Sequence, residues 1–249
     1  MIVKLPKFIA LIAKHFAGMR KSIARLYVTQ DVTGCEFETI IYPFDSDLMD
    51  GKRLIAIASG SIEDDEVALA QKYLDSDDVI VEFGSGMGIA AVRVHQAVSP
   101  KAHYCFEANP KPLAYAENLF AKNNLSIVVE NMALGDGATK TFYAVDDYIL
   151  SSFDKPQNRS DFEKIEIGTI AVAEVIKDKH PTAIFCDIEG AEGQFLPPED
   201  LHGVNKVIIE LHPHAYGAAG VDRIQNSFLA HGFRCVDTKG DTYCFIRLS

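Results

Sequence analysis

Two short runs of acids and histidines hold the side chains best suited to proton transfer. Each run accompanies an apolar stretch: Asp187, Glu189 and Glu192 follow 183–186, and Glu210, His212 and His214 lie at or beyond the end of 207–211. A neutral imidazole accepts a proton near pH 7, whereas an unperturbed carboxylate is a weaker base. We predict Asp187, His212 and Glu189 as catalytic residues, with His212 accepting a proton from a hydroxyl; a structural histidine is the alternative.

The same side chains are carboxylate and imidazole donors that could bind Mg²⁺ or a similar divalent cation. Proton transfer is favoured over metal binding, and no metal ligand is assigned. Glu192 and Glu210 have a second interpretation, in which they cap a helix and bond to the backbone.

A glycine-rich turn, GSGMG at 84–88, stands between an apolar run at 79–83 and a helical stretch at 89–98. A strand, turn and helix in this order place backbone N–H groups at the carboxyl edge of a sheet, where a nucleotide can bind. The third glycine of the dehydrogenase motif G-x-G-x-x-G is replaced by Ile89, and Glu82 precedes the turn. A carboxylate there would repel a pyrophosphate and attract a cation, which favours S-adenosylmethionine over NAD.

A second acid, Glu107, follows the strand-like run 103–106 and lies roughly 20 residues beyond Gly86, the offset at which an acid reaches ribose hydroxyls. A solvated acid at a strand end is the alternative. The loop 130–136, after the next strand-like run, is expected to lie over an adenine ring.

The acids, histidines and glycine turn can form one site only if the strands that precede them end at the same edge of a sheet. The order of predicted strands and helices indicates such a sheet. Apolar strand-like runs alternate with helical segments, which is typical of a Rossmann-like, doubly wound, mostly parallel α/β sheet. The predicted strands are 79–83, 103–106, 127–129, 141–145, 165–170, 183–186 and 207–211, with an antiparallel hairpin of 233–236 and 243–247. The predicted helices include 61–74, capped by Ser61, and 112–122, 171–177 and 220–231. We expect a methyltransferase-type domain at 61–249.

Residues 1–60 are predicted to form an N-terminal extension. Its first part, 1–27, has only basic ionisable residues and apolar residues at helical spacing, which indicates a basic amphipathic helix. Docking on the acidic body or on a second subunit is favoured over membrane contact, so a homo-oligomer is compatible with the sequence. The segments 35–44 and 53–58 are expected to be two strands around a polar turn.

Composition limits the size of the core, the kind of acceptor and the cellular location that we predict. The chain has 249 residues, 48% of them hydrophobic, enough for one sizeable core. A net charge of −11 argues against nucleic acid and for a small-molecule or saccharide acceptor. Five cysteines without a C-x-x-C pair indicate reduced core thiols and a cytoplasmic location.

The motifs EFGSGMG, FEANP, ALGD, DIEGAE and IELHP occur in this order over 62–211, and in this the chain resembles the FkbM family of class I S-adenosylmethionine-dependent methyltransferases. The resemblance implies a seven-stranded, mostly parallel sheet and O-methylation of hydroxyls on sugars, polyketides or other metabolites. It implies that Glu82, Gly84 and Gly86 hold the methionine end, Glu107 the ribose and 131–133 the adenine, and that Asp187 with Glu189 faces the methyl group. The predicted cofactor-binding residues are Glu82, Phe83, Gly84, Ser85, Gly86, Glu107, Ala108, Asn109, Asn131, Met132, Ala133 and Asp187.

Two other classes of function remain open. One is a nucleotide-binding oxidoreductase of the NAD type. Ile89 at the position of the third glycine and the absence of a Tyr-x-x-x-Lys dyad argue against it. The other is a non-catalytic module that binds S-adenosylmethionine, against which stand the acids and histidines at two strand ends.

Overall fold

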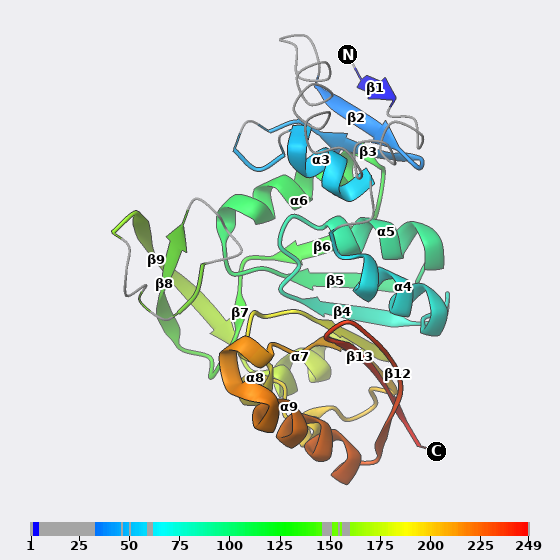
Figure 1. The fold of residues 1–249 in the computed structure, drawn as a ribbon, viewed down its shortest axis with the longest axis vertical. Helices are drawn as coiled ribbons and strands as arrows, with labels where there is room; N and C mark the ends of the chain where they lie inside the picture. The colour runs from blue at the N-terminus through cyan, green and yellow to red at the C-terminus, as the bar shows by residue number, and fades with distance from the viewer. Residues whose placement is uncertain are drawn as a thin grey trace.

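The computed structural model describes residues 2–4, 33–45, 47–49, 51–58, 62–145, 151–153, 155 and 160–248. These residues form a seven-stranded central sheet and two three-stranded sheets, one near the N-terminus and one beside the carboxyl edge of the central sheet (Figure 1). The central sheet carries the predicted site.

The central sheet has the strand order β12-β13-β11-β10-β4-β5-β6. The five strands from β11 to β6 pair in parallel, whereas β13 runs antiparallel to both β11 and β12. The prediction of a mostly parallel seven-stranded sheet with a closing antiparallel hairpin is therefore confirmed. The strands are β4 (Val79–Phe83), β5 (Ala102–Phe106), β6 (Ile127–Glu130), β10 (Ala183–Cys186), β11 (Lys206–Glu210), β12 (Phe233–Lys239) and β13 (Thr242–Arg247).

Helices cover both faces of this sheet, which explains why its parallel strands have unbroken apolar sequences. On one face, α4 (Asp64–Tyr73), α5 (Ile89–Val98) and α6 (Pro110–Lys122) pack over the strands. On the other face, α7 (Val172–Lys179) and α9 (Pro213–Ala230) pack over the strands, and Phe228 of α9 lies against Phe233 of β12 and Phe245 of β13. All four residues of β10 are buried, as a central strand requires.

The N-terminal sheet consists of β1 (Ile2–Lys4), β2 (Gly34–Phe37) and β3 (Ile40–Pro43). A hairpin joins β2 to β3 through Glu38 and Thr39, both with positive φ, as a two-residue turn of this hand needs. The hairpin is held on α6, since Asn123 accepts from the backbone N–H of Ile41 and donates to its carbonyl oxygen. The hairpin and α6 therefore share one core.

One prediction for the extension and one for the start of the following domain need correction. The segment 53–58 is not a strand, because it lies in α3 (Gly51–Ala58). A short apolar run of this length has no decisive period, so its sequence did not separate strand from helix. The helix predicted at 61–74 begins later, with Glu63 as N-cap, while Ser61 lies outside the described residues. The basic helix predicted within 1–27 also lies outside them, apart from β1, and the boundary at residue 60 stays a prediction.

A long hairpin of β8 (Thr139–Val145) and β9 (Phe162–Ile170) stands apart from the central sheet (Figure 1). Its base is tied to the central domain by β7 (Ala133–Leu134), which pairs in parallel with β9. Beyond β8, the buried Ser151 accepts from the N–H of Val145 and from the side-chain amide of Asn109. The segment after β8 therefore passes next to the end of β5 at Ser151.

Within the described part of the chain, no helix is long and apolar enough to cross a membrane. The five cysteines are free thiols, and all but the half-buried Cys235 are buried, as predicted for core residues.

Candidate functional site

The glycine turn lies at the carboxyl end of β4, where the sheet order reverses between β4 and β10. Gly84, Gly86 and Gly88 all have positive φ, a backbone conformation that disfavours side chains. At Gly84 a Cβ atom would lie 1.6 Å from the carbonyl oxygen of Asp187, so only glycine fits. The turn thus packs directly on the loop that follows β10, and it brings the predicted cofactor turn and a predicted catalytic residue into contact.

Glu107 lies beside this turn, at the end of β5. One carboxylate oxygen accepts from the N–H of Gly86 and the other from the N–H of Asn109, each at 2.7 Å. Burial raises the pKa of Glu107 to about 7, although these amide donors act in the opposite direction. Glu107 is therefore a fixed acceptor next to the glycines and not a solvated acid at a strand end.

The residues around Glu107 hold its backbone in place. Asn109 is the N-cap of α6 and accepts from the N–H of Lys111. Asn131 donates from its side-chain amide to the carbonyl oxygens of Glu107 and Ala108, each at 2.9 Å. The predicted ribose and adenine segments are thus joined by hydrogen bonds at the ends of β5 and β6.

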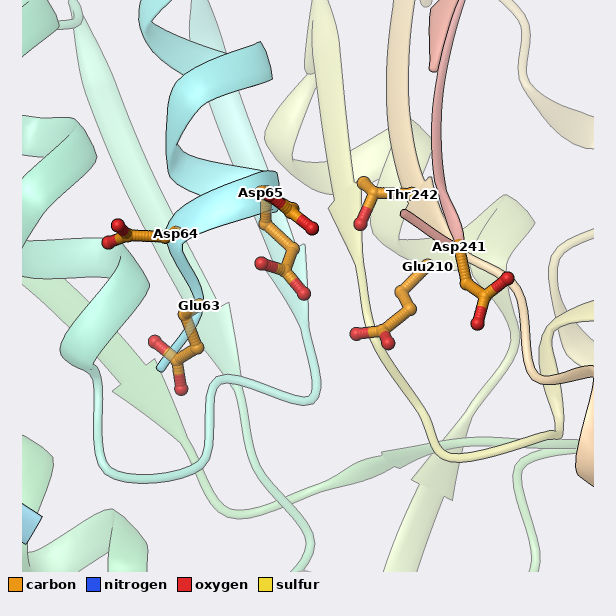
Figure 2. A pocket seen from close by; sticks show the side chains of 7 residues that line it. Glu63, Asp64, Asp65, Glu210, Asp241 and Thr242 are labelled. Atoms are coloured by element: carbon orange, nitrogen blue, oxygen red, sulfur yellow. The ribbon is translucent and has the colours of Figure 1, made fainter. Parts of the chain in front are cut away.

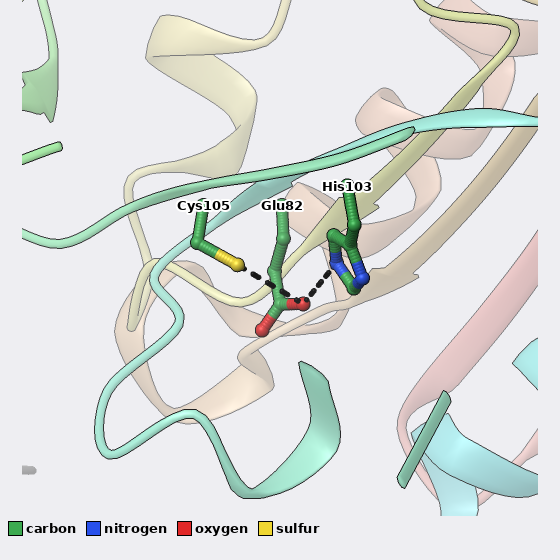
Figure 3. Close-up of side chains that lie close together, drawn as sticks. All are labelled: Glu82, His103 and Cys105. Carbon is green, nitrogen blue, oxygen red and sulfur yellow. Dashed lines mark hydrogen bonds and ion pairs between the residues drawn. The ribbon is translucent and has the colours of Figure 1, made fainter. Parts of the chain in front are cut away.

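Glu82 is placed differently from its neighbours in the predicted set. It is buried, and its Oε2 lies 3.0 Å from Nε2 of His103 and 3.9 Å from the thiol of Cys105, both on β5 (Figure 3). Among the described residues, Glu82 therefore bonds to side chains of the neighbouring strand β5 and not to the amides of the glycine turn. The partner of Glu82 is thus His103, which was not predicted from the sequence.

The three predicted catalytic residues do come together. Nε2 of His212 lies 3.4 Å from Oδ1 of Asp187 and 3.4 Å from Oε2 of Glu189. On the other side of the ring, Nδ1 of His212 lies 3.0 Å from Oε1 of Glu192. Glu192 is fully buried and also accepts from the N–H of Gly190, so it fixes the orientation of the imidazole.

The surroundings of His212 contradict the assumption that its imidazole is neutral near pH 7. Burial alone would lower the pKa of His212, but the hydrogen bond to Glu192 and the charges of Glu192, Asp187 and Glu189 raise it to about 9. Near pH 7 the imidazole is therefore protonated, and it is not the neutral base predicted from its ordinary pKa. Burial and the charge of Glu189 raise the pKa of Asp187 to about 7.

An acidic pocket of about 220 Å³ opens next to this cluster. One wall is the start of α4, and the opposite wall comes from the end of β11 and from the β12–β13 turn (Figure 2). Every residue that lines it except Thr242 is an acid: Glu63, Asp64, Asp65, Glu66, Glu210 and Asp241.

Acids at the start of a helix are commonly solvated, but two of the acids at the start of α4 are not. Glu66 is buried, and Oε2 of Glu63 is buried without a hydrogen-bond partner. Burial raises the pKa of Glu63 to about 8, with a further contribution from Glu82. Burial and a hydrogen bond to Glu66 raise the pKa of Glu210 to about 9. Only folding brings α4 against β11, so sequence spacing does not reveal this group.

No family model matches the chain, and no curated protein matches it in sequence. Solved structures do resemble it. TrmK of M. capricolum, solved with S-adenosyl-homocysteine, is 15% identical over 72% of this chain and 65% of that one, with a TM-score of 0.42. The ribosomal protein L11 methylase of Lactobacillus delbrueckii subsp. bulgaricus is 15% identical over 74% and 77%, with a TM-score of 0.46.

A third similar structure is TrmK of B. subtilis, described as a tRNA methyltransferase. It is 15% identical over 73% of this chain and 63% of its own, with a TM-score of 0.44. The present chain thus spans less than two thirds of the length of either TrmK chain.

The strand order, with antiparallel β13 between β12 and β11, is the Rossmann-like fold of class I methyltransferases. This is the class of fold predicted from the sequence. No family model matches the chain, so membership of the FkbM family stays a prediction. The cytoplasmic location also stays a prediction.

The predicted partners are contradicted by the comparisons. Similar structures include a tRNA methyltransferase and a methylase of ribosomal protein L11, so this fold is not confined to small-molecule or saccharide acceptors. The exclusion of nucleic acid rested on the net charge of −11, which is a sum over the whole chain. A sum of this kind does not describe the surface that meets an acceptor.

Proposed function

We propose that the protein is an S-adenosylmethionine-dependent methyltransferase. In this proposal the cofactor lies across the carboxyl ends of β4, β5 and β6, with Glu107 on its ribose and the glycine turn beside its methionine end. The acceptor approaches from the ends of β10 and β11, where Asp187, Glu189 and His212 meet. In open α/β sheets ligands bind at this edge, at the point where the strand order reverses.

The observation that carries the proposal is a group of acids around the glycine turn: Glu63 at the N-cap of α4, Glu66 in α4, Glu82 in β4, Asp187 and Glu210. Burial and the neighbouring acids raise the pKa of Glu63, Asp187 and Glu210, so a cation bound there is stabilised as these acids lose their protons. S-adenosylmethionine brings an ammonium and a sulfonium group to such a site, whereas the pyrophosphate of NAD would meet carboxylates that repel it. This favours the methyl donor over the oxidoreductase alternative.

Within this activity we propose oxygen as the acceptor atom. A sulfonium methyl is already activated, so the protein must align the acceptor and remove its proton. Asp187 and Glu189 can accept a proton, and the protonated His212 between them can orient both acids. A set of acids positioned in this way would have no task in a module that only binds the cofactor.

Calorimetric titration tests the proposed function. We expect S-adenosyl-homocysteine and S-adenosylmethionine to bind with one-to-one stoichiometry, and NAD to show no binding at the same concentrations. Binding of NAD without a response to S-adenosyl-homocysteine would contradict the proposal and favour the oxidoreductase.

Glu107 makes the affinity for S-adenosyl-homocysteine depend on pH. Its carboxylate must be charged to accept from both ribose hydroxyls, and its pKa is about 7 in the protein without ligand. Below pH 7 binding must first remove a proton, so affinity should fall by up to about tenfold per pH unit, and it should level off above pH 7.

The matched variant is Glu107→Gln, which keeps the shape of the side chain and does not titrate. It should bind more weakly than wild type at pH 8, by about 1–3 kcal/mol, because a charged acceptor is lost. It should also lose the part of the pH dependence that Glu107 causes. If the affinity of Glu107→Gln depended on pH as that of wild type does, Glu107 would not be the residue that binds the ribose.

A further inference from the structure

Asp187, Glu210 and His212 form a group of possible metal ligands at the ends of β10 and β11. Each offers one donor atom, and the three donor atoms lie within 4.8 Å of one another. Two carboxylates and one imidazole are a donor set that suits divalent first-row metals such as Mn²⁺ or Fe²⁺. Mg²⁺ and Ca²⁺ prefer oxygen ligands alone, so the imidazole makes them weaker candidates.

The orientation of His212 is that of a histidine in a metal site. Its Nδ1 is bonded to the buried Glu192, which in turn accepts from the N–H of Gly190 and from the hydroxyl of Tyr216. Nε2 is then directed towards the carboxylates of Asp187 and Glu189. Metal-bound histidines commonly donate their second ring nitrogen to a carboxylate in this way, which fixes the tautomer and the ring.

A second observation is a buried acceptor inside the group. Oδ1 of Asp187 is buried and accepts no hydrogen bond among the described residues, and its ion-pair contact with Nε2 of His212 is long, at 3.4 Å. A metal ion bound by both atoms would give this buried oxygen a direct partner. The Asp187 side chain as a whole keeps 28% of its exposure, which leaves an open side for an oxygen ligand from outside.

Among the described residues, one other group with suitable donors, formed by Glu82, His103 and Cys105, lacks this open side. All three residues are buried, and Oε2 of Glu82 already faces Nε2 of His103 (Figure 3).

We propose that Asp187, Glu210 and His212 bind a divalent cation of the Mn²⁺ or Fe²⁺ type, with a coordination position open to the acceptor. The ion takes the place of the proton on Nε2 of His212 and of the proton between Glu210 and Glu66, both of which pass to solvent, and Glu189 stays next to it as a proton acceptor. Binding of the ion does not depend on the proposed function. Its use does: a hydroxyl on such an ion loses its proton more readily than a free hydroxyl.

The test uses Mn²⁺ and the full-length protein after treatment with a chelator, without S-adenosylmethionine or an acceptor. Electron paramagnetic resonance counts the bound ion, and the spin-echo modulation of ¹⁴N reports an imidazole nitrogen bonded to it. We expect one bound Mn²⁺ and a nitrogen signal. We expect His212→Gln to lose the nitrogen signal and Glu210→Gln to weaken binding by at least the roughly 10- to 100-fold that loss of a second-shell partner costs.

The matched control is Asp241→Asn, which removes an acid from the same pocket but not from the three ligands; its Mn²⁺ affinity should stay close to that of wild type. Circular dichroism checks that each variant is folded, and Asp187→Asn replaces any variant that is not. The proposal is overturned if wild type binds no Mn²⁺, if bound Mn²⁺ gives no nitrogen signal, or if the ligand variants bind as wild type does. Since the readout needs no methyl transfer, failure here would leave the binding of S-adenosyl-homocysteine untouched.

Discussion

His212→Gln is expected to lower methyl transfer by about 100-fold or more, while affinity for S-adenosyl-homocysteine stays nearly unchanged. The imidazole lies between Asp187 and Glu189 and is held by Glu192, so its loss leaves both acids without the group that orients them. The ribose and glycine contacts lie at the ends of β4 and β5 and do not include this ring. The measurement is the rate of S-adenosyl-homocysteine release with an acceptor isolated from fractionated extract.

The control for this substitution is His202→Gln, which makes the same chemical change at an exposed position before β11. It should retain the wild-type rate. If His212→Gln turned over as fast as His202→Gln, the histidine would be structural and the acids alone would carry the reaction.

Gly84→Ala is expected to have the second large effect, on both stability and cofactor binding. The added Cβ would lie 1.6 Å from the carbonyl oxygen of Asp187 and 2.7 Å from its carbon, and backbone atoms cannot move aside as a flexible side chain can. The positive φ of 81° adds its own strain. We expect a loss of about 3 kcal/mol or more in the free energy of unfolding, or failure to fold.

Gly137→Ala separates these two causes. Gly137 has a φ of 86°, close to that of Gly84, but a Cβ there meets nothing within 4 Å. It should therefore cost only the backbone strain, about 1–2 kcal/mol. Chemical denaturation of both variants measures the difference. Equal destabilisation would show that the contact between the glycine turn and Asp187 is not tight.

The sheet was predictable from the sequence because its strands are buried on both faces. Runs such as Ala183–Cys186 have no polar residue to interrupt them, and a parallel sheet under two helical layers requires this. The prediction failed at 53–58, where a run of the same kind belongs to α3. Packing on the N-terminal hairpin, and not local periodicity, decides the structure of such a short segment.

The sequence predicted which residues of the candidate site lie close together, but not the pKa values of their side chains. Strand ends aligned Asp187 with His212, as expected for neighbouring parallel strands. The pKa of His212 depends on the buried Glu192, and the acidic pocket depends on α4 meeting β11; both are contacts between segments far apart in the chain. Only the folded structure shows the contact with Glu192 that raises the pKa of His212, and only there do Glu63 and Glu66 line a pocket with Glu210.

A crystal structure of the complex with S-adenosyl-homocysteine tests the central claim most directly. We expect the ribose hydroxyls on Glu107, the homocysteine end beside Gly84 and Gly86, and the sulfur facing Asp187 and His212. A ligand bound elsewhere, or one at this edge whose sulfur faces away from Asp187 and His212, would contradict it.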